Sequence, residues 1–314
     1  MNKICLVVIY NHKYEKNIPV IDRIYKGRFS HVYHVMPFAE TKQQNVIGVY
    51  ESAYQFQGYV AQAARVFRSD EYTHYVFVAD DMVLAPHLNE NNVVDVLSLN
   101  NNTAFISSKP EILTRSKAMN WIQGMSALAF MNQQGNACEW HHELPSIEEA
   151  REKFELAGLD WKDGVDVNFW RYAMLIMRAG RLSPYMLRPL PLIGRCLRFV
   201  SRCDDMVYPM AYGYSDFFVI PNTGFDKFVH YSGVLSAMRV FVEVAIPTAM
   251  ILSCKNIRTL ADIGMKAEDG VVDYKVRERI ESSANLSYTE LLKNFPKDYL
   301  YIHPVKLSKW KDLP

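Results

Sequence analysis

The chain has 314 residues, and its 35 Lys and Arg nearly balance its 34 Asp and Glu. A hydrophobic content of 49% is enough for a sizeable core in one large α/β domain or two small ones. The near-neutral balance gives no global field that would favour nucleic acid as a partner, so a charged ligand must be recognised by local clusters.

Cysteine usage and hydropathy indicate the cellular compartment of the protein. The five cysteines are scattered without the spacing of a zinc site, which predicts reduced thiols in a cytosolic protein. The apolar run at 4–10 is too short for a signal peptide and is better interpreted as a first strand. The longest apolar stretch, 240–252, contains Glu243 and Pro247 and falls short of the roughly 20 residues needed to cross a bilayer.

The first third of the chain alternates strands and helices. The apolar patterns predict strands near 4–10, 31–36, 45–50 and 75–78 and helices near 18–24 and 57–67. This rhythm predicts an α/β fold whose mostly parallel sheet is flanked by helices. Ligands of such sheets bind beyond the carboxyl ends of the strands, where Tyr10, Asn11, Asp80 and Asp81 are expected.

Two helices are predicted in the later part of the chain. Ser146 and Glu149 fit a capping box, which indicates a helix over 147–156. A second, long helix is expected from about Ser232 to Ile246, where Arg239 and a glutamate four residues later would pair one turn apart.

Asp80 and Asp81 are adjacent carboxylates at the end of the apolar run "YVFVA". Two neighbouring acids repel each other, so a metal ion, a basic group or water must compensate them. The alternative to a metal site is that one of them caps the next helix or lies solvated in a turn.

The helix "GYVAQAARVF", the apolar strand after it and "VADDMVLAP" together resemble the nucleotide-sugar-binding half of glycosyltransferases with the GT-A fold. The resemblance covers roughly residues 3–88, and more loosely the segment at Asp216 and the C-terminal histidine. It implies a single large domain in which residues 1–100 bind the nucleotide sugar and residues 101–314 form the acceptor-binding and C-terminal part.

In that family a DxD motif holds a divalent cation against the donor's diphosphate. Ala79 stands at the first position here, so the motif is an xDD variant in which Asp81 keeps the metal position. The resemblance implies nucleotide-sugar contacts at Tyr10, Asn11 and Asp80. Mn²⁺ or Mg²⁺ in such a site neutralises the charge that develops on the leaving diphosphate.

The C-terminal motif "HPVK" is the second candidate element. In several GT-A enzymes a C-terminal histidine completes the metal site and a nearby basic residue contacts the diphosphate, which implies these roles for His303 and Lys306. The alternative is a surface histidine beside a solvated lysine.

Asp216 is the candidate general base. An inverting glycosyltransferase needs a carboxylate to accept the proton of the acceptor hydroxyl, and the aromatic residues around Asp216 suit a sugar-binding site. The alternative is a turn aspartate before a buried strand whose aromatics belong to the core. Glu243 and the pair His141-His142 are weaker candidates for the base.

One segment has a marked charge bias. Seven arginines lie between Asp166 and Arg202: Arg171, Arg178, Arg181, Arg188, Arg195, Arg198 and Arg202. A solvated face over an apolar core is the simpler interpretation. The other is peripheral contact with the inner face of a membrane, or with an anionic acceptor.

The leading function is therefore a cytoplasmic glycosyltransferase that uses a nucleotide sugar and a glycan or lipid-linked acceptor in cell-surface polysaccharide or lipopolysaccharide synthesis. A nucleotidyltransferase would use the same acids and metal, but "VVIYNHKYEKN" lacks the glycine-rich phosphate loop expected of it. A catalytically silent carbohydrate-binding protein is the third possibility, from a non-enzyme class.

Overall fold

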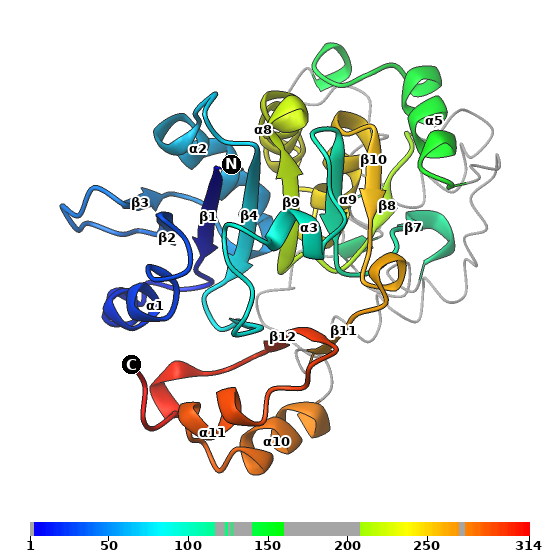
Figure 1. The fold of residues 1–314 in the computed structure, drawn as a ribbon. Coiled ribbons are helices and arrows are strands. Elements are labelled where there is room, and N and C mark those ends of the chain that lie inside the picture. Colours follow the sequence, from blue (N-terminus) through cyan, green and yellow to red (C-terminus); the bar gives the residue numbers. More distant parts are fainter. Residues whose placement is uncertain (1–2, 117–122, 125–126, 128–139, 160–207, 270–273) are drawn as a thin grey trace, which may run out of the picture.

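The computed structural model of the chain describes residues 3–116, 123–124, 127, 140–159, 208–269 and 274–314. The Arg171–Arg202 segment lies outside these residues. The described part is built on a seven-stranded sheet with the strand order β10-β6-β9-β4-β1-β2-β3 (Figure 1). Its strands are β1 (Ile4–Ile9), β2 (His31–Pro37), β3 (Val46–Val49), β4 (His74–Ala79), β6 (Thr103–Ile106), β9 (Phe217–Pro221) and β10 (Asn256–Arg258).

The sheet is mostly parallel, as the sequence predicts. β1 pairs in parallel with β2 and β4, β2 with β3, and β10 with β6. β9 runs antiparallel to both of its neighbours, β4 and β6. Every residue of β1 and β4 is buried, which explains why both strands are continuous apolar runs without polar alternation.

Helices cover both faces of the sheet. Alternate residues of β1 belong to two different core clusters, because successive side chains of a strand point to opposite faces. One cluster includes residues of α2 (Phe56–Phe67), α8 (Asn222–Ala237), α9 (Val242–Ser253) and α5 (Ile147–Leu156). The other includes residues of α1 (Ile18–Tyr25), α3 (Val93–Val96), α10 (Tyr274–Ser283) and α11 (Tyr288–Lys293).

The C-terminal segment lies below the carboxyl ends of β1 and β4 in Figure 1. Its strands β11 (Lys266–Asp269) and β12 (Tyr299–His303) form a three-stranded sheet with β5 (Val83–Leu84), the short strand that follows the acid pair. Ile302 pairs with Val83 in the antiparallel register of β12 and β5. This register brings the end of β12 to the acid pair. A further two-stranded sheet joins β7 (Glu111–Ile112) to β8 (Ala211–Tyr212).

The predicted capping box at the start of α5 is confirmed. The hydroxyl of Ser146 accepts a hydrogen bond from the Glu149 N–H at 3.2 Å, and the Glu149 carboxylate accepts one from the Ser146 N–H at 3.0 Å. Gly158, just beyond the helix, has a φ of 75°, a left-handed conformation that glycine adopts readily.

The long helix predicted from Ser232 to Ile246 is wrong. α8 ends at Ala237 and α9 begins at Val242, and Arg239 between them has a left-handed φ of 57°. The side-chain amide of the buried Gln57 donates to the Val240 carbonyl at 2.7 Å. This hydrogen bond holds the segment between the two helices in a non-helical conformation. Arg239 pairs with Glu51 instead of the glutamate four residues later, with 3.0 Å between Arg239 Nη1 and Glu51 Oε1.

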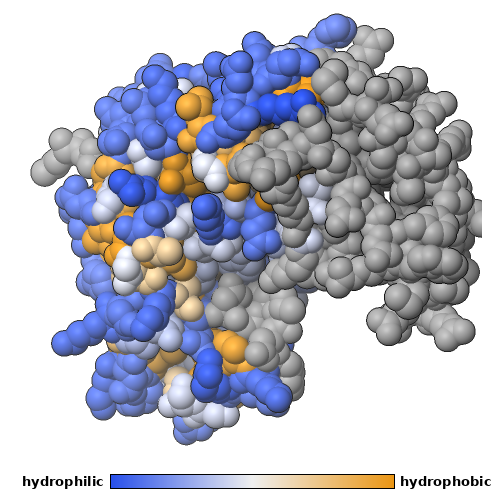
Figure 2. Space-filling model, turned by 90° about the vertical axis from the view of Figure 1, so that its right-hand side faces the viewer, coloured by the Kyte–Doolittle hydropathy of each residue, from blue (hydrophilic) through white to orange (hydrophobic). Residues whose placement is uncertain are grey.

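None of the helices within the described ranges combines the length and the apolar character that crossing a membrane requires. The described part of the face drawn in Figure 2 is mostly hydrophilic, with apolar residues in separate groups.

Candidate functional site

The acid pair follows the last residue of β4, in the middle of the sheet edge where the parallel strands end. Asp80 and Asp81 are each only 8% exposed. The Asp80 N–H donates to the Ile9 carbonyl at 2.9 Å, which extends the pairing of β4 with β1 to the acid pair. The predicted site residues from these two strands therefore lie together because the strands are parallel neighbours.

Asp81 meets the C-terminal motif. Its Oδ1 is 2.9 Å from His303 Nε2, and its Oδ2 accepts a hydrogen bond from Lys306 Nζ at 2.9 Å. The Val305 N–H also donates to the backbone carbonyl of Asp81. These contacts join parts of the chain separated by 222 and 225 residues.

The pKa values of the two carboxyl groups are shifted in opposite directions. Burial alone would raise the pKa of Asp81, but His303 and Lys306 together lower it to about 2. Burial, and then the neighbouring Asp81 charge, raise the pKa of Asp80 to about 7, although the backbone N–H of Asn11 and the same two basic groups oppose the shift. Asp81 is therefore the carboxyl group of the pair that stays ionised. The charge repulsion between the two groups appears as the raised pKa of Asp80.

Lys306 is the accessible cation of the site. Partial burial would lower its pKa, but the charges of Asp81 and Asp80 raise it above the ordinary value. Its side chain remains 45% exposed, so the ammonium group can meet a ligand that approaches from solvent. A compact ammonium charge of this kind suits a phosphate oxygen.

His303 is held at both ring nitrogens. Nε2 faces Asp81, and Nδ1 lies 2.6 Å from the hydroxyl of Tyr214. Tyr214 is in the segment between β8 and β9, whose aromatic residues the sequence assigned either to a sugar-binding site or to the core. Its contact with His303 was missed because the two residues are 89 positions apart.

Tyr10 lies behind the site. It is fully buried, and its hydroxyl is 2.9 Å from Nδ1 of His34, whose Nε2 is 2.9 Å from Asp22 Oδ1. Burial lowers the pKa of His34 despite the opposing effect of Asp22, which favours a neutral ring whose Nδ1 can accept a hydrogen bond from the Tyr10 hydroxyl. The Tyr10 side chain is thus buried against His34, whereas the half-buried Asn11 lies beside Asp80.

Asp216 reaches the site edge through its backbone. Its carbonyl accepts a hydrogen bond from the Ala79 N–H at 3.0 Å, directly before the acid pair. The residue is partly exposed.

The weaker candidates for the base lie elsewhere. Glu243 is in the first turn of α9 and interacts with the hydroxyl of Tyr212. His142 is exposed beside Trp140, which packs in the core cluster of α2 and α8 on the other face.

The donor set at Asp81 and His303 fits a divalent cation. Asp81 Oδ1 and His303 Nε2 lie 2.9 Å apart, a hydrogen-bond distance, and an ion bound by both atoms would replace the proton on Nε2. No group of three or more His, Cys, Asp and Glu side chains suited to a metal occurs within the described ranges. The remaining ligands would come from phosphate oxygens and water, as is usual for Mg²⁺ in phosphoryl-binding sites.

A scan against protein-family models matched no family, and a search of curated proteins found no related sequence.

Proposed function

We propose that the protein is a GT-A-like glycosyltransferase that transfers a sugar from a nucleotide-sugar donor to a glycan or lipid-linked acceptor. The observation that carries the proposal is the contact of Asp81 with both His303 and Lys306 at the carboxyl edge of the sheet. A carboxylate and an imidazole can bind a metal ion, and an ammonium group beside them can bind a phosphate oxygen of a metal-bound diphosphate.

In this proposal Asp81 and His303 hold Mn²⁺ or Mg²⁺, which would act as a Lewis acid toward the departing diphosphate. Lys306 contacts a phosphate oxygen that the ion leaves free. Asp80 and the backbone N–H of Asn11 orient the donor next to the ion. The two carboxylates, which repel each other in the free protein, gain a shared counter-charge when donor and ion bind.

Asp216 acts as the general base in this proposal. It lies across the β4–β9 pairing from Ala79, so an acceptor bound there would approach the donor from the β9 side. The proposed setting is cell-surface polysaccharide or lipopolysaccharide synthesis in the cytoplasm, and a lipid-linked acceptor would bring the protein to the inner membrane face.

Thermal shifts with a panel of nucleotide sugars, with and without Mn²⁺, test this function. The right donor at a hundredfold excess over its Kd stabilises the protein by about 2.7 kcal/mol, and the effect should require the metal. Hydrolysis of the same donor in the presence of Mn²⁺ would distinguish an enzyme from a catalytically silent carbohydrate-binding protein. If no donor shifts the melting temperature, with or without metal, the proposal is wrong.

A further inference from the structure

The contact between Tyr214 and His303 carries an inference beyond the proposed ligands. The Tyr214 hydroxyl is 2.6 Å from His303 Nδ1, while Nε2 on the other side of the ring is 2.9 Å from Asp81. The His303 side chain is only 3% exposed, so bulk water cannot readily replace either partner. Whatever His303 does at Nε2, Tyr214 must accommodate at Nδ1.

The states that His303 can occupy place different demands on that partner. Without metal, Nε2–H donates to Asp81, and Nδ1 either accepts a hydrogen bond, if the ring is neutral, or donates one, if the ring is charged. When Nε2 gives its lone pair to a metal ion, the proton is on Nδ1, which then needs an acceptor. A tyrosine hydroxyl can serve in each of these states, whereas a backbone carbonyl or a carboxylate accepts only.

We propose that Tyr214 is a positioning residue of the metal site, whose hydroxyl holds His303 at Nδ1 without metal and accepts the Nδ1 proton when Nε2 binds the ion. This inference rests on the proposed metal site at Asp81 and His303. Partners of this kind fix the ring orientation and the tautomer of a ligating histidine.

The ring of Tyr214 is held independently of its hydroxyl. The segment is fixed before it by the Gly213 N–H, which donates to the Glu243 carbonyl at 2.9 Å, and after it by the Ala79–Asp216 hydrogen bond. The ring also packs against the core cluster on the α1 face. Removal of the hydroxyl alone should therefore leave the fold in place.

The test is a Mn²⁺ titration of the full chain followed by electron paramagnetic resonance, alone and with each of UDP, GDP, CDP and ADP. Tyr214→Phe should bind Mn²⁺ about 10- to 100-fold more weakly than the wild type. Tyr212→Phe is the matched control, because its hydroxyl, two residues earlier, interacts with Glu243. Its Mn²⁺ affinity should be unchanged.

Equal Mn²⁺ affinity of Tyr214→Phe and wild type would overturn the role of Tyr214 while leaving the proposed function in place. Absence of Mn²⁺ binding to the wild type under every condition would overturn both. A measurement on the wild type alone guards against a variant that does not fold. In ¹⁵N-labelled protein Nε2 of His303 should lose its proton while Nδ1 carries one when the diamagnetic ion Zn²⁺ is added, and an Nε2 that keeps its proton contradicts the inference.

Discussion

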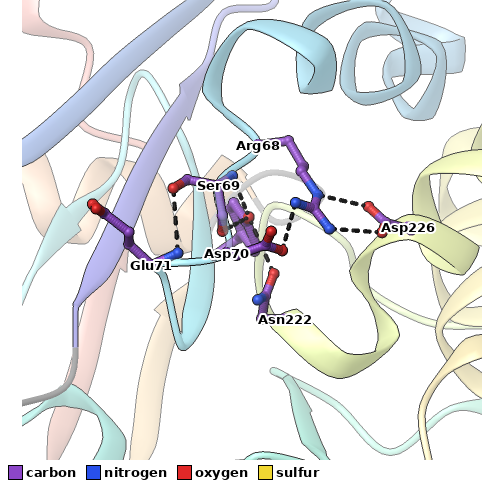
Figure 3. A network of polar contacts seen from close by, with 7 residues as sticks. Arg68, Ser69, Asp70, Glu71, Asn222 and Asp226 are labelled. Carbon is purple, nitrogen blue, oxygen red and sulfur yellow. Dashed lines mark hydrogen bonds and ion pairs between the residues drawn. The ribbon is translucent and has the colours of Figure 1, made fainter.

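The two ends of β4 carry polar networks of opposite character. Before its amino end, Arg68 at the end of α2 pairs with Asp226 of α8 through hydrogen bonds of 3.1 and 3.0 Å, and with Asp70 at 2.5 Å (Figure 3). At its carboxyl end, Asp81 pairs with His303 and Lys306. Both networks join carboxylates to basic groups across distant parts of the chain.

Burial separates the two networks. The Arg68, Asp70 and Asp226 side chains are 36%, 82% and 68% exposed, so water and salt share in compensating their charges. The Asp81 side chain is only 11% exposed, so its compensation must come from the protein or from a bound ligand.

The comparison teaches which network stores an unfavourable interaction. The two acids of the Arg68 network share one arginine, but both are exposed to water, and the network ties α2 to α8 at the surface. The Asp81 network leaves Asp80 buried beside a like charge, with its pKa raised to about 7. Such imbalance is typical of functional sites, because a bound cation can relieve it.

The largest expected effect comes from removal of Asp81. Asp81→Ala should abolish Mn²⁺-dependent stabilisation by the donor and lower transfer on the order of 10³-fold, since the ion supplies several kcal/mol to the transition state. Donor thermal shifts and initial rates measure both effects. Asp226→Ala at the opposite network is the control and should keep both properties. Transfer by Asp81→Ala at a near wild-type rate would contradict the proposed site.

Removal of Asp216 should separate binding from chemistry. Asp216→Asn should lower transfer about 10²- to 10⁴-fold, because loss of a general base has this effect, while the Mn²⁺-dependent thermal shift with donor survives. Loss of donor binding along with activity would assign Asp216 to the donor site or to the fold. Full activity would direct the search for the base to Glu243 and then to the pair His141-His142.

Replacement of Asp80 by asparagine should stabilise the protein at neutral pH, whereas most substitutions of buried residues destabilise it. The folded state holds the Asp80 proton more tightly than the unfolded state, because its pKa is raised from 3.8 to about 7. The wild type therefore loses stability through this group as pH rises from about 4 to about 7. Asp80→Asn cannot ionise and should be more stable above pH 7 by at most about 4 kcal/mol, an advantage that fades toward pH 4.

Urea unfolding without divalent cations, at about pH 5 and about pH 8, measures this difference. The depressed pKa of Asp81 acts in a lower window, where its stabilising contribution is lost as pH falls from 3.8 toward 2. If the free energies of unfolding of wild type and Asp80→Asn change with pH in the same way, the pKa of Asp80 is not raised in the folded protein.

The smallest effect is expected at the Arg68 network. Arg68→Ala should lower the melting temperature slightly at low salt, and the difference from wild type should vanish near 1 M salt, where the Debye length is about 3 Å. Mn²⁺ binding should be unaffected. A large, salt-independent loss of stability would mean that the exposed network contributes more than its burial suggests.

Local patterns predicted most of the elements in the first third of the chain. The expected helices near 18–24 and 57–67 correspond to Ile18–Tyr25 and Phe56–Phe67, because apolar periodicity and local propensity act within each segment. The same approach failed at Arg239. Its left-handed backbone accompanies a hydrogen bond from Gln57 to Val240 across 183 positions, which no local signal announces.

The sequence by itself determined that a pair of carboxylates ends a buried strand of a mostly parallel sheet, where such folds bind ligands. It also marked His303 and Lys306 as candidate partners through a family resemblance. Only the tertiary structure decided that both groups reach Asp81, that Tyr214 holds His303, and that Tyr10 faces His34 in the core. The physical reason is that strand order and the register of β12 against β5 fix these contacts, and both depend on packing between segments far apart in the chain.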